Sequence, residues 1–504
     1  MPTRKSYCRI CGAWCAIKVD VQDNKVIAIH GDKDDPETKG FTCTKGRQIP
    51  FQMNESKRLL TSLARNENGT LETIDYQQAV RRIASKLQQI IDRHGPRSVA
   101  VYCGTHGWFN SAFIPVVRAW LDKLGSPNYY SSLTVDCPAQ FTAKARAGHW
   151  AGGHHSFKSA DVVLMAGRNP LVSNLSSTLG GLPGSNPGRL LKDARQRGLK
   201  LICVDPRESD LAKRADIHLQ LKPGEDASLF AGLIHVILQE DLHDQAFCER
   251  WVDGLNTLRN AVQAFTPEYA ALRAEVPVEK LVEAARLFAR GPRGCASGGL
   301  GTEMSRHAEL NHYLILALNI ICGRFNRQGE RVANPGVLLP PGPLFEGTLP
   351  KEQLPSIMSF GTGEQPRVRG LKSICGEMPC NGLADEILTP GDGQVRAFIC
   401  VGGNPVLAFP DTDKTIKAMK DLELLVCVDP HRSATAALAD YVIAPKLPLE
   451  RDDLTVLGDA NYEQPYAHYA PAVVDAAPEL VEEWEFILDL AAEMGTDITI
   501  NEER

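Results

Sequence analysis

Four cysteines near the N-terminus have the spacing of ligands to a metal cluster. Cys8, Cys11 and Cys15 fall within eight residues, and Cys43 follows after a gap, which gives the pattern C-x2-C-x3-C-x27-C. A 4Fe-4S cluster takes one thiolate at each iron, so three cysteines in a short loop and a fourth on a returning segment satisfy its ligand count. Zinc sites, the alternative, usually pair their ligands as two C-x2-C units, and Cys43 has no such partner beside it. The spacing therefore favours a 4Fe-4S cluster over zinc, and over ordinary buried thiols.

A motif that ends in Asp-Pro occurs twice in the same surroundings. Cys-Val-Asp-Pro stands at residues 203–206 and again at 427–430, and Ser, Ala, Ala and Asp follow both copies at identical spacing. Each copy comes after an apolar run that ends in a Gly-x-Asn-Pro turn, at residues 167–170 and 402–405. Such self-similarity predicts two homologous structural units.

The polar residues of the two copies could hold the nucleotide parts of a cofactor. Turns at the carboxyl ends of parallel strands are where open α/β sheets bind ligands. Asn169 and Asn404 can donate and accept hydrogen bonds, while Asp205 and Asp429 suit ribose hydroxyls or a base edge. The alternative is that Asp-Pro simply ends a strand, but two copies in matched context favour contact with a cofactor. No Gly-x-Gly-x-x-Gly fingerprint lies between a strand and a helix, so ordinary NAD binding has little support.

Short apolar runs bounded by Gly or Pro must position these residues. They lie at residues 98–103, 162–166, 199–205, 396–401 and 423–429. Such runs are typical of parallel strands covered on both faces. An amphipathic helix is predicted over residues 79–91 and should end near Gly95. The class is therefore α/β.

The domain boundaries follow from these elements. We expect a cluster-binding domain over residues 1–57, with two short strands at 16–20 and 25–30. Two homologous doubly wound α/β domains should follow. The domain with the first copy spans residues 131–335, and the domain with the second copy combines 58–130 and 336–500.

Composition excludes several classes of protein. The chain has 504 residues, and 55 basic against 61 acidic residues leave a net charge of −6, which offers no cationic field for nucleic acid. No apolar run approaches the length of about 18 residues that a membrane span requires. The 14 cysteines suggest metal or redox chemistry in a reducing compartment, and the chain begins without a recognisable signal peptide. We therefore expect a cytoplasmic location.

Taken together, these motifs resemble those of the molybdopterin oxidoreductases of the dimethyl sulfoxide reductase superfamily. The resemblance rests on the four cysteines followed by Lys45-Gly46, on the two repeat copies, and on Pro-Gly-Glu-Asp at residues 223–226. It implies a bis-molybdopterin guanine dinucleotide cofactor that holds molybdenum or tungsten, with one dinucleotide on each copy and Lys45 between cluster and pterin. The residues that it assigns to the cofactor are Lys45, Gly167, Asn169, Pro170, Asp205, Arg207, Asp226, Gly403, Asn404 and Asp429.

In this superfamily a side chain usually reaches the metal from the stretch that corresponds to residues 131–142. Cys137 is our first choice, because a thiolate is the softest donor there. Asp136 competes, since an aspartate before a prolyl turn resembles the nitrate reductase branch, and an alternative alignment brings Thr142 to the same place. Pro138 stands where formate dehydrogenases have a histidine, which counts against formate oxidation. Cys137, Asp136 and Lys45 are the residues that we assign to catalysis, and a Cys137 without a metal is the alternative.

Other residues able to do chemistry receive weaker assignments. One of four histidines near the predicted metal ligand could serve as an acid or base, and none is singled out: His106, His149, His154 and His155. Four further cysteines stand at strand ends in apolar company and are predicted to be inert core residues: Cys103, Cys203, Cys400 and Cys427.

The resemblance also sets an expectation about partners. Such proteins usually continue into a C-terminal β-barrel domain, whereas this chain ends soon after a helix predicted over residues 479–494. The chain could be a fragment, a scaffold without cofactor, or a protein whose barrel is a separate subunit, as in formylmethanofuran dehydrogenases. We expect an oxidoreductase that acts on a small molecule and passes electrons through the cluster to a partner protein.

Two other functions stay open at the level of sequence. The chain could be a cofactor-less electron-transfer subunit resembling the large iron-sulfur subunit of respiratory complex I, or a non-redox hydratase such as acetylene hydratase. The retained polar residues of both repeat copies favour the enzyme over the relay subunit.

Overall fold

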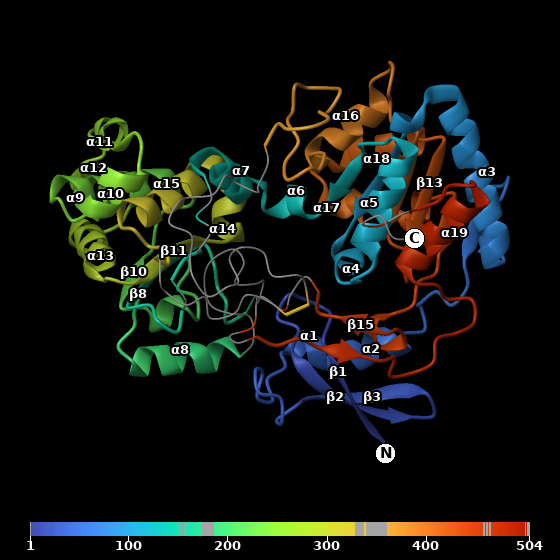
Figure 1. Ribbon diagram of the computed structural model, residues 1–504, viewed down its shortest axis with the longest axis horizontal. Coiled ribbons are helices and arrows are strands. Elements are labelled where there is room, and N and C mark those ends of the chain that lie inside the picture. Colours follow the sequence, from blue (N-terminus) through green and yellow to red (C-terminus); the bar gives the residue numbers. More distant parts are fainter. Residues whose placement is uncertain are drawn as a thin grey trace.

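Two α/β lobes lie side by side, and a small three-stranded sheet lies against the lower side of one of them (Figure 1). The computed structural model describes residues 2–148, 150, 153–155, 157–172, 186–327, 337–338, 360–456, 459, 462, 465–498 and 500. We call the lobe with strands β8 to β11 the first-repeat lobe and the lobe with strands β12 to β14 the second-repeat lobe. Among the helices described, none combines the length and the apolar run needed to cross a bilayer.

The small sheet is an antiparallel meander at the N-terminus. Its strands are β1 (Thr3–Tyr7), β2 (Ala16–Gln22) and β3 (Lys25–Gly31), and the short helices α1 (Thr44–Arg47) and α2 (Ile49–Asn54) follow. Asp23 and Asn24 form the tight turn between β2 and β3 with φ angles of 49° and 58°, which these side chains tolerate. Alternating residues predicted β2 and β3, whereas β1 is missing from the sequence prediction because its first half is exposed and polar.

The first-repeat lobe is built on a parallel sheet with the order β10-β9-β8-β11. The strands are β8 (Val162–Ala166), β9 (Lys200–Val204), β10 (Ile217–Leu219) and β11 (Gly294–Gly298). All of β8 is buried, since its alternate side chains face helices on both sides of the sheet. One face packs on α8 (Pro187–Gln196), and the other on α9 (Asp226–Gln239), α13 (Val278–Arg290) and α15 (Ala308–Ile321). Three shorter helices extend this lobe: α10 (Gln245–Trp251), α11 (Leu255–Val262) and α12 (Pro267–Ala274).

The second-repeat lobe contains a larger sheet of the same construction. Its order is β5-β4-β14-β13-β12-β6-β7, and only the pairings of β4, with β14 and with β5, are antiparallel. The strands are β4 (Leu63–Arg65), β5 (Leu71–Thr73), β6 (Val99–Cys103), β7 (Tyr129–Ser131), β12 (Ala397–Val401), β13 (Leu424–Val428) and β14 (Tyr441–Ile443). One face packs on α3 (Tyr76–His94), α5 (Phe113–Leu124) and α19 (Glu483–Glu493), the other on α16 (Leu383–Leu388) and α18 (Thr412–Asp421).

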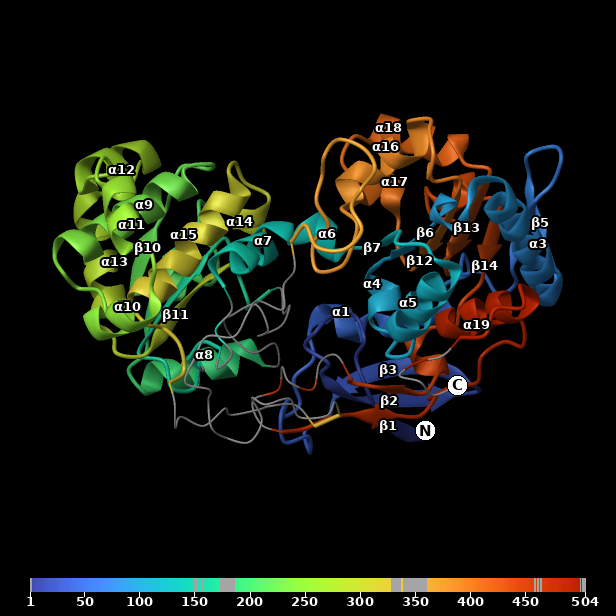
Figure 2. The ribbon, with the colours of Figure 1, turned by 45° about the horizontal axis from the view of Figure 1, so that its top comes forward.

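The chain crosses between the lobes near the predicted metal ligands. After β7 it continues through α6 (Leu133–Asp136) and α7 (Pro138–Ala147) into the first-repeat lobe, as Figure 2 shows. It later returns, so that β12 pairs in parallel with β6 although almost 300 residues separate them, Ala397 opposite Val99 and Val401 opposite Cys103. The second-repeat lobe thus combines two segments that are far apart in the sequence.

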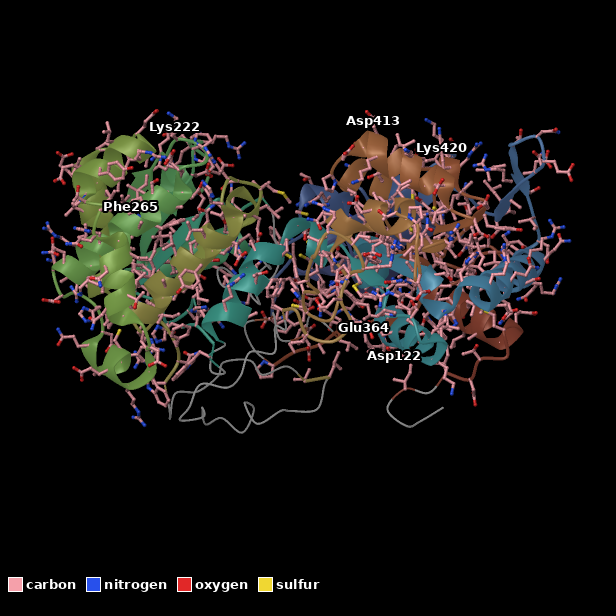
Figure 3. The ribbon with its side chains drawn as sticks, turned by 90° about the horizontal axis from the view of Figure 1, so that it is seen from above. Asp122, Lys222, Phe265, Glu364, Asp413 and Lys420 are labelled. Carbon is pink, nitrogen blue, oxygen red and sulfur yellow. The ribbon has the colours of Figure 1, made fainter. Side chains whose placement is uncertain are left out.

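The segment of residues 360–378 lies over α5 and β7. Glu377 anchors it, because its carboxylate accepts a hydrogen bond from Ser131 Oγ at 2.5 Å and pairs with Arg118 at 3.1 Å. A pocket of about 250 Å³ remains between this segment and α5, lined among others by Asp122 and Glu364, both labelled in Figure 3. Burial raises the pKa of Glu377 to about 7.

A buried ion pair joins the segment that follows α2 to the C-terminal part of the chain. Arg58 Nη1 and Nη2 donate to both carboxylate oxygens of Glu450, at 2.7 and 2.5 Å, and both side chains are almost fully buried. Glu450 also accepts the backbone N–H of Leu447. This bidentate contact links residues nearly 400 positions apart.

We expect Glu450→Gln to destabilise the protein by about 3–5 kcal/mol, because it leaves the Arg58 charge buried without its partner. The midpoint of urea denaturation measures the loss. Asp193→Asn is the matched control, since Asp193 pairs with Arg189 at 3.2 Å on the exposed surface of α8 and should change stability by less than about 0.5 kcal/mol. Equal effects of the two substitutions would contradict a structural role for the buried pair.

Candidate cofactor site

The four N-terminal cysteines converge at one end of the small sheet. Backbone hydrogen bonds from Cys8 N to Cys15 O (2.8 Å) and from Trp14 N to Cys11 O (3.3 Å) fold the loop that carries three of them. Cys43 lies at the N-terminus of α1. Cys8 and Cys15 are buried, whereas Cys11 and Cys43 are partly exposed.

The four thiols are near enough to one another to influence each other's pKa. Burial, and next the other three thiols, raise the pKa of Cys15 well above its usual range. Burial also raises the pKa of Cys8 to about 12, and Cys11 and Cys43 add to the effect. Four mutually interacting thiols are a set that binds metal with release of protons.

The surroundings of the thiols fit an iron-sulfur cluster. Among the described residues no three His, Cys, Asp or Glu side chains are grouped to hold one metal ion, but a 4Fe-4S cluster takes only one thiolate at each iron. Thr42 Oγ1 is buried and has no hydrogen-bond partner among the described residues. A Cβ atom on Gly46 would lie 2.5 Å from this hydroxyl and 3.5 Å from Cys8 Sγ, so the glycine keeps the space beside the thiols open.

Lys45 lies on α1, directly beside the cysteine loop. Its side chain is exposed. Helix α1 lies on the side of the small sheet that faces the two lobes (Figures 1 and 2). Burial raises the pKa of Cys11, and the backbone N–H of Ala13 and the Lys45 ammonium oppose this rise. The Lys45 cation therefore favours the thiolate of Cys11.

In the first-repeat lobe, the Gly-x-Asn-Pro turn lies where the strand order of its sheet reverses. From β8 the chain leads to β9 on one side, while β11 pairs with β8 on the other. The chain therefore leaves β8 and β11 in opposite directions at this point. At their carboxyl ends the two strands are still in contact, because Gly301 N donates to Gly167 O at 2.9 Å. A Cβ atom on Gly167 would lie 2.7 Å from the Gly301 Cα atom, so the approach requires glycine. Open α/β sheets bind ligands at such switch points.

The second-repeat lobe repeats this arrangement. Its switch point lies between β12 and β6, and Gly104 N donates to Val401 O at 2.8 Å. A Cβ atom on Gly104 would lie 2.4 Å from Gly402 O, and one on Gly403 would lie 2.5 Å from the Tyr102 ring. Both Gly-x-Asn-Pro turns thus occupy the same position in their own sheets.

The Asp-Pro residues of both copies have equivalent contacts. Asp205 Oδ1 accepts the backbone N–H of Arg207 at 2.9 Å, and Asp429 Oδ1 accepts that of His431 at 2.8 Å. This turn chemistry belongs to the end of a strand, and it occupies one carboxylate oxygen in each copy. Arg207 is exposed, while Asp429 is buried, which raises its pKa.

The asparagines and Asp226 are held by nearby groups. Asn169 Oδ1 accepts the N–H of Leu171 at 3.2 Å, immediately after the buried Pro170. Asn404 precedes α17 (Pro405–Ala408), and its Oδ1 accepts the hydroxyl of Thr435 at 2.8 Å. Asp226 begins α9 and is buried, and Ser305 Oγ donates to it at 3.3 Å. These oxygen acceptors are therefore fixed in place before any ligand binds.

Two candidates for the metal ligand lie between α6 and α7. Cys137 is buried against Phe141 and Ile374, and Cys375 packs beside them. Burial, and next the Asp136 carboxylate, raise the pKa of Cys137, so its thiolate needs a metal or a cation. Burial also raises the pKa of Asp136.

The third candidate ligand is already engaged in the helix. Thr142 Oγ1 donates to the Pro138 carbonyl at 2.9 Å, within α7. Lys144 follows on the same helix; burial lowers the pKa of Lys144, whereas the thiols of Cys375 and Cys137 oppose this change. The sequence prediction did not include Lys144, because a lone helical lysine carries no motif.

Glu303 holds the start of α7, and the sequence prediction missed it. It ends the short helix α14 (Leu300–Glu303), and its carboxylate accepts the N–H groups of Ala139 (3.1 Å) and Gln140 (3.0 Å). His312 Nε2 lies 3.3 Å from the same carboxylate. Glu303 thereby fixes the segment that carries the candidate ligands. A capping residue that lies more than 150 positions from the helix it caps leaves no local signal in the sequence.

The candidate histidines have separate environments. His106 Nδ1 pairs with the buried Glu483 at 2.8 Å, and His155 Nδ1 accepts the N–H of Gly294 at 3.0 Å. His154 Nδ1 lies 3.0 Å from the Arg324 carbonyl. His149 lies outside the described residues. Burial opposes the ionisation of Glu483, but Arg451 and His106 lower its pKa to about 2.

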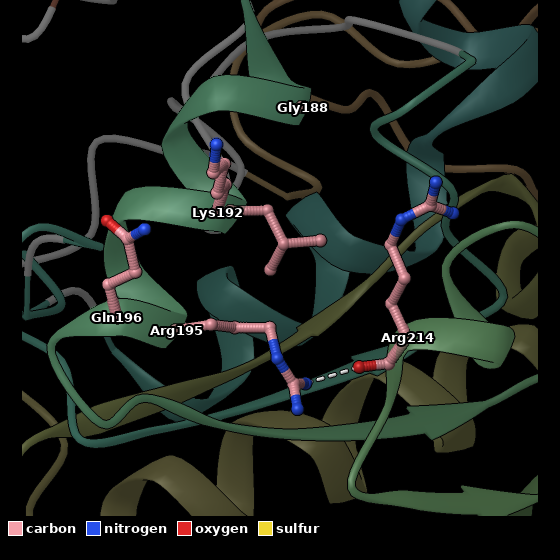
Figure 4. A pocket seen from close by; sticks show the side chains of 6 residues that line it. Gly188, Lys192, Arg195, Gln196 and Arg214 are labelled. Atoms are coloured by element: carbon pink, nitrogen blue, oxygen red, sulfur yellow. Dashed lines mark hydrogen bonds between the residues drawn. The ribbon is translucent and has the colours of Figure 1, made fainter.

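A surface pocket is unconnected with these residues. It has a volume of about 430 Å³ and lies on α8, where Lys192, Arg195 and Arg214 project around it (Figure 4). Arg195 donates to the Arg214 carbonyl in this view and also pairs with Asp216. None of the residues predicted to bind the cofactor lines this pocket.

Gly46→Ala should abolish or strongly weaken cluster binding, because the added Cβ would press on Thr42 Oγ1 and approach the Cys8 sulfur. We expect at least a tenfold loss of bound iron and of visible absorbance in anaerobically purified protein. Gly188→Ala on α8 is the control, since a Cβ there meets nothing within 4 Å. Full iron content in Gly46→Ala would show that the glycine is not required.

Burial raises the pKa of Glu303 from 4.5 to about 7. Between these values the folded chain retains a proton that the unfolded chain has released, so stability should fall as the pH rises from about 4.5 to about 7. Glu303→Gln should remove up to roughly 1.4 kcal/mol per pH unit of this slope. Denaturation of the metal-free chain at several pH values measures it. Glu309→Gln, in an exposed ion pair with Arg146, should leave the slope unchanged, and an unchanged slope in Glu303→Gln would contradict the prediction.

Comparison with known proteins identifies relatives along most of the chain. The thiosulfate reductase molybdopterin-containing subunit of Salmonella typhimurium is 26% identical over 97% of this chain and 64% of its own length. Acetylene hydratase of Syntrophotalea acetylenica is 28% identical over 97% of this chain and 68% of its own length. The solved structure of acetylene hydratase from Pelobacter acetylenicus matches with a TM-score of 0.79 and 26% identity, covering 98% of this chain and 69% of that one. The chain thus spans about two thirds of the length of these relatives.

Two family models match the chain consecutively. The molybdopterin oxidoreductase Fe4S4 domain matches residues 1–55, which confirms the prediction of a 4Fe-4S cluster over zinc. The molybdopterin oxidoreductase model matches residues 58–493 and implies a molybdopterin cofactor with molybdenum or tungsten. The doubly wound fold and the resemblance stated from the motifs are confirmed as well. The chain therefore belongs to the molybdopterin oxidoreductase family.

Proposed function

We propose that this chain is a molybdopterin-dependent oxidoreductase that acts on a small molecule and passes electrons through its N-terminal cluster to a partner protein. One observation carries the proposal. Two equivalent switch points, each with a Gly-x-Asn-Pro turn, lie in separate lobes. The four-thiol module lies against the second-repeat lobe, where Trp14 packs on Phe109. A cofactor with two dinucleotide arms needs two such sites.

The chain's own residues have distinct roles in this proposal. The turns after β8 and β12 hold the two dinucleotides, with Asn169 and Asn404 presenting their amide groups and Asp205 and Asp429 their carboxylates. When bound, the molybdopterin metal exchanges two electrons with the substrate and the 4Fe-4S cluster relays them singly. Lys45 places an ammonium group between the thiols and the lobes, where it favours additional negative charge on either group.

We assign the metal ligand to the α6–α7 junction. Cys137 supports this role because it is a soft donor, and metal binding would compensate the burial that disfavours its thiolate. Asp136 is the competing ligand, and the contact of Thr142 with Pro138 makes its hydroxyl the weakest of the three. Glu303 keeps this junction in place through the N–H groups of α7.

The names of the relatives state different substrates. Sequence similarity to them therefore does not identify the substrate of this chain. Thiosulfate reductase and nitrate reductase, the latter from Symbiobacterium thermophilum, are redox enzymes, whereas acetylene hydratase names a hydration. A hydratase is therefore the second candidate, and the structural match to acetylene hydratase favours it. We also propose a cytoplasmic location, because fourteen cysteines in one chain favour a compartment in which thiols stay reduced.

Metal analysis of protein purified without oxygen tests the proposal. We expect about four iron atoms and about one molybdenum or tungsten atom per chain, together with reduction of a dye when the right substrate is supplied. Iron without molybdenum or tungsten would refute the oxidoreductase and support a relay subunit. Both metals with substrate hydration and no dye reduction would support the hydratase instead.

A further inference from the structure

Arg9 is a buried cation directly beside a cluster ligand. It follows Cys8 in the cysteine loop, and its side chain has no exposed surface. The guanidinium lies over the Tyr7 ring at 4.4 Å, and its Nη1 donates to the Pro448 carbonyl. Among the described residues, its Nε and Nη2 atoms have no hydrogen-bond partner.

Arg9 shares the carboxylate of Asp453 with a second arginine. Arg9 Nε lies 3.6 Å from Asp453 Oδ2, and Arg451 Nη1 lies 3.0 Å from the same oxygen. All three side chains are at most 1% exposed. Glu483, whose pKa Arg451 lowers, accepts hydrogen bonds from His106 and Asn110. Arg9 therefore has Asp453 as its carboxylate partner, whereas Arg451 interacts with both Asp453 and Glu483.

Arg9 is covalently adjacent to Cys8, so its buried charge lies beside one of the cluster ligands. Burial raises the pKa of Cys8, and Arg9 is among the groups that lower it. Water is excluded around Arg9, so its interaction with a nearby charge is screened far less than that of a surface lysine. A reduced 4Fe-4S cluster carries one more negative charge than an oxidised one, and a cation beside it favours the reduced form.

We propose that Arg9 and Asp453 together set the reduction potential of the N-terminal cluster, with Arg9 raising it and Asp453 moderating that effect. The proposal rests on the proposed function, because it requires the cluster to be present as an electron relay. Arg9 acts as a positioning and tuning residue: it contacts neither substrate nor the reacting atoms. Its orientation is fixed by Tyr7, Pro448 and Asp453, so the charge cannot turn away to solvent.

Redox titration of the cluster in three single variants, followed by electron paramagnetic resonance, tests the proposal. Arg9→Gln removes the cation and should shift the midpoint potential to lower values. Asp453→Asn removes the anion and should shift the potential to higher values. Arg9→Lys keeps the charge and should shift the potential less than Arg9→Gln does.

The opposite signs separate tuning from loosened packing. Both neutral substitutions disturb the same buried group and lower the unfolding midpoint, so a merely structural role would move both potentials in the same direction. Lys5→Gln is the control for charge alone. Lys5 lies in the same sheet, but its side chain is 68% exposed, so the shift should be small.

Three results would overturn the proposal. Shifts of the same sign in Arg9→Gln and Asp453→Asn would do so, as would unchanged potentials in cluster-bearing variants. If Arg9→Gln does not retain the cluster, the potentials of Arg9→Lys and Asp453→Asn test the proposal instead. In that case the absence of an upward shift in Asp453→Asn would refute it. A wild-type chain without any cluster would instead refute the proposed function.

Discussion

The close approach of backbone to backbone at two switch points is the constraint on which the candidate site depends. Gly167 lies against Gly301 in one lobe and Gly104 lies against Gly402 in the other, at distances that leave no room for a Cβ atom. Because no side chains fill these positions, the backbone itself forms the end of each sheet. The Asn and Asp groups that follow are then presented from equivalent positions in two unconnected sheets.

The repeat is preserved in hydrogen bonds as well as in sequence. Gly167 N donates to Val204 O at 2.9 Å, and Gly402 N donates to Val428 O at 3.0 Å. These bonds tie the Gly-x-Asn-Pro turn of each copy to its own Asp-Pro strand. The two halves of the repeat motif are thus one structural unit, which explains why they are duplicated together.

Buried charges hold the cluster module to the rest of the protein. Arg58 with Glu450, and Arg9 and Arg451 with Asp453, connect the first sixty residues to a segment near residue 450. Such pairs tolerate little change, because loss of one partner leaves the other desolvated. Of these charges, Arg9 also adjoins the cluster ligand Cys8 and lowers its pKa.

The sequence alone determined the features that are encoded locally. Cysteine spacing predicted the cluster, because three of its four ligands lie in one short loop. Short apolar runs predicted the central strands to within one or two residues, because each strand is a continuous stretch of the chain. Only the tertiary structure decided which strands are neighbours, with β6 beside β12 across almost 300 residues. It also revealed Glu303 at the start of α7 and the pairing of Arg9 with Asp453. These side chains belong to no motif, and their roles arise from burial next to partners that are remote in the sequence.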